Sequence, residues 1–155
     1  MAETVHLFLK VNGKPVKGES TIQTEGRADS IECLSYAQSV TAVTEGASSQ
    51  VTGRRQFTPI KVTKRIDKCS PVLLKALGTN EKIDGTFKFY RPNPAGDGTT
   101  EQFYTVELED GKISGISQTG TTGSDSPPLE EISFVFKTIT WTYTNGGATH
   151  KDSWK

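Results

Sequence analysis

The sequence predicts a mainly β protein, built as a small closed antiparallel β-barrel with one short α-helix. Three observations support this fold class. Alternating apolar residues recur along the chain, only one segment carries a helical pattern, and the longest alternating segment, residues 130–144, changes phase halfway. A pleated strand cannot bury both phases on one face, so we expect a bulge or sharp bend near Lys137 and Thr138. Such a bend lets one strand serve two sheets or turn a barrel corner.

The first half of the chain supplies three alternating segments. Residues 5–11 place four apolar side chains on one face and end at the turn dipeptide Asn12-Gly13. Residues 31–43 form a longer, mildly apolar run, and residues 60–66 alternate between apolar and polar side chains. We therefore expect a strand in each of these segments.

One segment carries a helical pattern. Ser70 stands where an N-cap belongs, and Pro71 occupies the first helical position, where its missing N–H costs nothing. The apolar stripe that follows consists of Val72, Leu73, Ala76 and Leu77. Gly78 then ends the predicted helix.

The second half predicts strands over residues 82–91 and 130–144, with a hairpin between them. Residues 102–109 and 112–117 alternate on either side of the turn dipeptide Asp110-Gly111. Two alternating runs around such a dipeptide are typical of a β-hairpin.

Two long polar segments separate these elements. Residues 44–56 follow a long strand and carry the paired arginines Arg54 and Arg55, which favours a loop that reaches another molecule. Residues 118–128 are rich in Gly and Ser, and we interpret them as a flexible connection without an assigned role.

Length and charge narrow the classes of partner. A chain of 155 residues is expected to form one domain over 1–155. Its 18 basic and 18 acidic residues balance, which argues against nucleic acid or an acidic membrane as partner. The sequence shows no secretory signal pattern, and no segment is apolar over about 18 residues, so we expect no membrane insertion.

Residues that carry chemistry are sparse. His6 is expected to point outward from the first strand and His150 to lie in a solvated tail, and neither stands in a catalytic or metal-binding spacing. Cys33 and Cys69 are expected to be small buried thiols. We therefore predict no catalytic residue, no cofactor and no metal.

One pair of carboxylates keeps an enzyme hypothesis open. Asp84 and Glu107 could meet across neighbouring strands, as the carboxylates of a glycosidase do. Charged side chains on strand faces are far commoner, so a hydrolase ranks third. It follows a structural role and a stand-alone β-barrel that binds a small ligand or carbohydrate.

An ordered set of motifs resembles one protein family. The motifs are Gly18-Glu19-Ser20, Thr63-Lys64, Ile66-Asp67-Lys68, Ser70-Pro71, Phe89-Tyr90-Arg91 and His150-Lys151-Asp152-Ser153-Trp154. In this order they resemble the haemolysin-coregulated protein (Hcp) family, the tube-forming component of bacterial type VI secretion systems.

The resemblance implies an assembly and a route. Six copies would form a ring, and rings would stack into a tube inside a contractile sheath that expels it behind a spike protein. The lumen would carry effector proteins. The chain would then reside in the bacterial cytoplasm before firing and be secreted, outside or into a target cell, without a signal peptide.

The resemblance also assigns site residues. Residues 44–56 match the extended loop that reaches toward the adjacent ring. The expected axial contacts are Glu45, Gln50, Arg54 and Arg55. The expected lumen-facing residues are the small side chains Ser35, Ala37 and Ser39.

Overall fold

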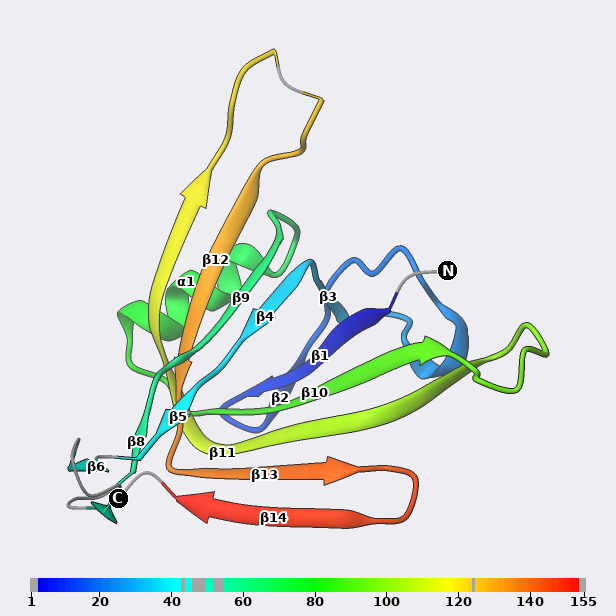
Figure 1. The fold of residues 1–155 in the computed structure, drawn as a ribbon. Coiled ribbons are helices and arrows are strands. Elements are labelled where there is room, and N and C mark those ends of the chain that lie inside the picture. The colour runs from blue at the N-terminus through cyan, green and yellow to red at the C-terminus, as the bar shows by residue number, and fades with distance from the viewer. Residues whose placement is uncertain (1–2, 43, 46–49, 52–54, 124, 154–155) are drawn as a thin grey trace.

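The described residues fold mainly into antiparallel strands with one α-helix, which confirms the mainly β part of the predicted fold class (Figure 1). The structure is a computed structural model, and it describes residues 3–42, 44–45, 50–51, 55–123 and 125–153. Side chains are described for all of these except residues 44–45 and 50–51.

Two walls of strands share one long strand, β11 (Thr100–Thr119). The β10 wall consists of the first half of β11 together with β1 (Thr4–Val11), β2 (Lys14–Val16), β3 (Ile31–Cys33), β10 (Ile83–Pro92), β13 (Thr138–Tyr143) and β14 (Ala148–Ser153). In this wall β11 itself pairs with β10 and β13. The β9 wall consists of the second half of β11, which pairs with β12 (Leu129–Val135), followed by β9 (Ile60–Arg65) and β4 (Ser35–Ala37).

The predicted hairpin at Asp110-Gly111 is wrong, because β11 runs through this dipeptide without reversing. Asp110 takes a positive φ of 52°, and the pairing register with β10 shifts nearby, so the strand bends there. Gly111 is required at the bend because a Cβ would lie 2.5 Å from the carbonyl oxygen of Val135. In other proteins this dipeptide often closes a hairpin. Here it bends one strand, which passes from the first wall to the second.

The bend predicted from the phase change in residues 130–144 is confirmed, because the strand is interrupted there. β12 ends at Val135, and β13 begins at Thr138. β12 pairs with β9 and the second half of β11, whereas β13 pairs with β14 and the first half of β11. The segment therefore serves both walls, as the switch in apolar phase predicted.

The closed barrel expected from the sequence is not what the described strands form. Their hydrogen-bonded order runs as an open path from β2 to β4. Cys33 and Tyr36 both turn inward although they stand three residues apart, so the chain changes phase at Leu34. β3 therefore pairs with β1, β4 pairs with β9, and neither ladder continues into the other.

The hydrophobic core consists of the inward-facing residues of both walls. Phe87 on β10 and Phe134 on β12 are fully buried, with their ring centroids 5.9 Å apart. Tyr36 packs edge-on against Phe87, with a centroid distance of 5.2 Å. Offset and edge-to-face contacts of this kind add to the free energy gained from burying the rings.

The helix α1 (Ser70–Gly78) packs against the core through Leu73 and Ala76. Two details of the prediction are wrong. Cys69, not Ser70, is the N-cap residue, because the Ser70 hydroxyl is bound to Glu130 and to the backbone N–H of Asp67. Val72 is exposed, since the buried stripe of so short a helix is narrower than expected.

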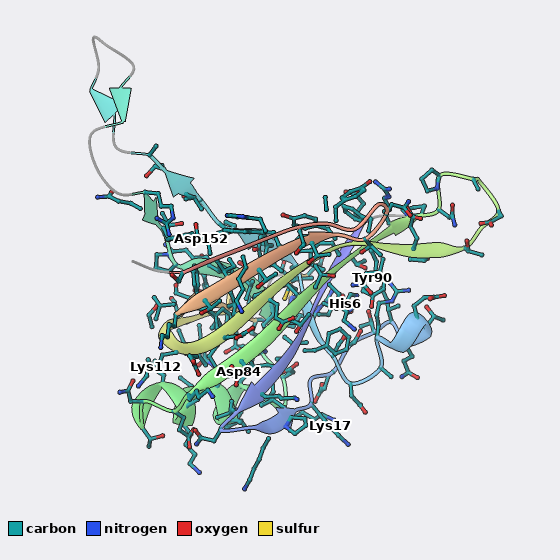
Figure 2. All side chains as sticks on the ribbon, turned by 90° about the horizontal axis from the view of Figure 1, so that it is seen from below. His6, Lys17, Asp84, Tyr90, Lys112 and Asp152 are labelled. Atoms are coloured by element: carbon teal, nitrogen blue, oxygen red, sulfur yellow. The ribbon has the colours of Figure 1, made fainter. Side chains whose placement is uncertain are left out.

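Two small two-stranded sheets extend away from the walls. The first pairs β5 (Val40–Thr41) with β8 (Gln56–Phe57), and the second pairs β6 (Thr44–Glu45) with β7 (Gln50–Val51). Figure 2 shows β6 and β7 well clear of the body of the protein. We call the described residues between 38 and 58 the projecting hairpin.

Candidate functional site

Three of the four residues predicted to stack rings, Glu45, Gln50 and Arg55, lie on the projecting hairpin. Glu45 and Gln50 are register partners in the β6–β7 ladder. Arg54 lies outside the described residues. Arg55 is described, and its guanidinium Nε donates to Asp152 Oδ2 at 2.6 Å, while a second guanidinium nitrogen contacts the other carboxylate oxygen. The structure therefore gives Arg55 a partner within its own chain.

The residues predicted to line the lumen are all exposed. Ser35 and Ala37 lie on the outer face of β4, opposite Thr63 and Lys61 of β9. Ser39 follows at the start of the projecting hairpin, where its backbone N–H donates to Thr58 Oγ1 at 3.0 Å. The structure thus places two of the three on one wall and the third beside it.

A row of mostly short polar side chains crosses the outer face of the β9 wall. The pairing register aligns Ser35 on β4 with Thr63 on β9, Glu131 on β12 and Ser117 on β11. The local sequence predicts only Ser35 as a member of this row. It does not identify the other three residues, because they lie on strands that are distant in the chain. The register shows that the small polar character extends across all four strands.

A buried ionic network joins β9, α1 and β12, and the sequence analysis did not predict it. The side chain of Lys64 is 1% exposed. Its ammonium contacts the carboxylates of Glu130 and Asp67, the latter at 2.9 Å, and donates to the Arg65 carbonyl at 2.8 Å. Ser70 donates its hydroxyl to the Glu130 carboxylate. Three of the motifs that carried the family resemblance meet in this network.

The network keeps Lys64 and Asp67 charged in spite of their burial. Burial opposes the charge on Lys64, but hydrogen bonds with Glu130 and Asp67 outweigh it and raise the pKa of Lys64. Burial also opposes the charge on Asp67, yet hydrogen bonds from Cys69 and Lys64 lower the pKa of Asp67. The arrangement is therefore a structural clamp that holds α1 against the β9 wall.

His6 does not point into solvent as the sequence predicted. Its side chain leaves the outer face of β1, but Arg27 and Ser30 cover that face, and His6 is fully buried. Ser30 donates its hydroxyl to the Arg27 carbonyl at 2.7 Å, so His6 Nδ1–H donates to Ser30 Oγ at 2.9 Å. His6 Nε2 then has no hydrogen-bond partner. Burial, with the Arg27 charge, lowers the pKa of His6 to about 4, against a smaller opposing effect of Glu32.

We expect acid to destabilise the fold through His6. Its folded pKa of about 4 lies below the ordinary 6.5, so its contribution is complete above pH 6.5 and is lost as pH falls toward 4. The loss is roughly 3 kcal/mol. Urea unfolding at pH 7 and pH 4.5 should show that the unfolding free energy falls less between these pH values for His6→Gln than for wild type. His150→Gln, at an exposed position, is the control. An equal fall in unfolding free energy for H6Q and wild type would contradict this account.

The carboxylates of the hydrolase hypothesis lie along one surface groove. Asp84 and Glu107 both line a groove of about 790 Å³ on the β10 wall. Asp84 accepts a hydrogen bond from the backbone N–H of Asp110 at 3.0 Å and lies 3.8 Å from Lys82. These contacts give Asp84 a structural role at the bend of β11.

The remaining chemical candidates are structural as well. Cys33 and Cys69 are free and buried, as predicted, and burial raises the pKa of each thiol to about 12. Within the described residues, no group of three or more His, Cys, Asp or Glu side chains is placed to hold a metal ion. The described part of the chain also contains no helix that is long and apolar enough to cross a membrane.

The described residues define a structural class of protein, in which exposed surfaces are the notable features. These are a projecting hairpin and an exposed face of small polar residues, carried by a two-walled β structure with one helix. A family model described as "Type VI secretion system effector, Hcp" matches residues 8–143. The chain belongs to this family, as its motifs predicted. Membership makes it a subunit of the type VI secretion tube, a structural and secreted protein, and does not favour the ligand-binding module.

Relatives agree over almost the whole chain. The chain is 33% identical over 137 residues to the "Major exported protein" of Pseudomonas aeruginosa strain PAO1, covering 84% of this chain and 78% of that protein. A mutant form of Hcp1 from E. coli EAEC 042 is 30% identical, with a TM-score of 0.87 over 99% of this chain and 100% of that one. Secreted protein Hcp3 from P. aeruginosa is 25% identical, with a TM-score of 0.81 over 99% of both chains.

Proposed function

We propose that six copies of this chain form a closed ring and that rings stack into the tube. The projecting hairpin carries the proposal, because a paired extension beyond the body of the subunit is suited to reach a neighbouring ring (Figure 2). In a closed ring each lateral contact joins two different patches of the subunit, so no self-complementary surface is needed.

The outer face of the β9 wall is proposed to line the lumen. Its row of Ser35, Thr63, Glu131 and Ser117 offers mainly short polar side chains, which leave room in a bore and present no apolar patch to a passing protein. Effector proteins would travel there, and the sheath and spike would engage the assembled tube. Export would follow the expulsion of the tube and would use no signal peptide.

The proposed stacking contacts are those of the hairpin. Glu45 and Gln50 occupy its outer ladder, and Arg54 and Arg55 follow. Charged and polar contacts of this kind are weakened by salt, which suits rings that must assemble and later separate.

Spin labels test which wall faces the lumen. In a six-fold ring the distance between neighbouring equivalent points equals their radius, so an inner label gives the shorter distance. Cysteine-linked nitroxides are placed in separate variants at Ser35 on the β9 wall and at Glu107 on the opposite outer face. We expect the Ser35 label to report the shorter neighbour distance by dipolar spectroscopy. A shorter distance from Glu107 would place the other wall inside the ring and refute the assignment.

A further inference from the structure

The projecting hairpin is held to the body by few backbone contacts. Its inner ladder consists of only two register pairs, Val40 with Phe57 and Thr41 with Gln56, and it forms a separate two-stranded sheet. An isolated two-stranded ladder is marginally stable in water. Side chains at its base therefore help to set the direction in which the hairpin projects.

One such contact is a two-point ion pair between the hairpin and β14. Arg55 donates to both carboxylate oxygens of Asp152, and it also donates to the Ser153 carbonyl at 3.1 Å. Bidentate pairs of this type fix orientation as well as distance. The hydrogen bonds from Arg55 lower the pKa of Asp152, consistent with a carboxylate held in its charged form.

Aromatic stacking continues the contact into the β10 wall. The Arg55 guanidinium lies 5.6 Å above the Phe57 ring, and Phe57 stacks on Trp141 of β13 with centroids 6.4 Å apart. Trp141 in turn stacks on His150 of β14 at 5.7 Å and an interplanar angle of 4°. A cation over an aromatic face and stacked rings are both attractive.

The other flank of the hairpin is tied to the same place. Trp141 donates its indole N–H to Gln38 Oε1 at 3.1 Å, just before β5 begins. Both flanks of the hairpin therefore meet the β13–β14 pair, and Figure 2 shows Asp152 on the side of the body from which the hairpin projects.

We propose that Asp152 is a positioning residue for ring stacking, which acts by anchoring Arg55 and so sets the direction of the projecting hairpin. This inference rests on the proposed stacking function. It changes the role of Arg55, which anchors its own hairpin instead of contacting the next ring. It also assigns a role to the C-terminal His150-Lys151-Asp152-Ser153 motif. Asp152 of this motif is 97 residues after Arg55 in the chain.

The anchor itself is tested on the whole protein by hydrogen exchange of the β5 and β8 amides. We expect Asp152→Ala and Arg55→Ala each to raise their exchange about tenfold, and the double variant to raise it no further. The charge swap Arg55→Asp with Asp152→Arg should restore most of the protection. Lys82→Ala, which removes a surface ion pair with Asp110 at 3.0 Å, is the matched control and should change nothing at the hairpin. Unchanged exchange in D152A would overturn the anchor.

The positioning role is tested on assembly. In the analytical ultracentrifuge and in electron micrographs, D152A and R55A should keep the mass of a ring but lose association between rings to the same extent, and the charge swap should recover it. Loss of stacking in R55A but not in D152A would overturn the proposal, because Arg55 would then act on the neighbouring ring directly. Wild-type rings that never associate would overturn the stacking role, and a wild type that forms no ring would instead refute the proposed function. The exchange result judges the anchor separately in either case.

Discussion

Replacement of Lys64 by methionine is expected to cost roughly 3–5 kcal/mol of unfolding free energy. The change removes the only ammonium in the buried network and leaves the carboxylates of Glu130 and Asp67 without their cation. A buried charge that loses its partner keeps the full cost of its desolvation. Urea unfolding at neutral pH and a fixed protein concentration measures the loss, since assembly would otherwise shift the apparent stability.

Lys61→Met is the matched control for Lys64→Met. Lys61 lies on the same strand but on its exposed face, so its replacement should change the unfolding free energy by less than about 0.5 kcal/mol. The double variant Lys64→Met with Glu130→Leu should recover part of the loss, because apolar pairs often replace buried ion pairs at little cost. If K64M and K61M showed the same small loss of unfolding free energy, the network would not be the clamp described here.

Truncation of Phe87 to alanine is the second change with a large expected effect, about 3–5 kcal/mol. Phe87 is fully buried and joins the two walls through its contacts with Tyr36 and Phe134. The variant loses the transfer free energy of the ring and leaves a cavity between walls that cannot easily close on each other. The midpoint of urea unfolding reports the change.

Phe8→Ala separates core packing from the loss of any aromatic ring. Phe8 lies on β1, on the outer face of the wall, partly exposed, with Lys88 Nζ 4.6 Å above its ring. Its truncation should cost only about 1 kcal/mol. Similar losses in F8A and F87A would show that the described core does not carry the stability of the fold.

Local patterns predicted the elements whose formation depends on one buried face. Alternation located β1, β9 and β10, and the Pro71-led apolar stripe located α1. The phase change in the last segment predicted its break correctly, because two apolar phases on one strand need two separate partners.

Other features depended on residues distant in the chain and could not be predicted locally. Asp110-Gly111 has the composition of a hairpin turn, and only the pairing of β11 with both β10 and β12 shows that it is a bend. His6 lies on the side of β1 that alternation predicted, but the segment containing Arg27 and Ser30 covers it. The local sequence around His150 likewise predicts a solvated tail, whereas this segment forms β14 by pairing with β13.

The candidate site shows the same division. Ser35 and Ala37 were recognised as a small polar face, whereas the rest of the row became visible only from the register of β9, β12 and β11. Lys64 shares the inward phase of β9, and a lysine at an inward position signals a buried partner. The sequence could not show that this partner is Glu130, or that Arg55 binds Asp152.

The mass of the purified assembly tests the central claim most directly. Size-exclusion chromatography with light scattering, over a range of protein concentrations, should give about six times the 16.9 kDa mass of the chain. Electron micrographs of the same fraction should show closed rings. A protein that elutes with the mass of one chain at every concentration would contradict the account.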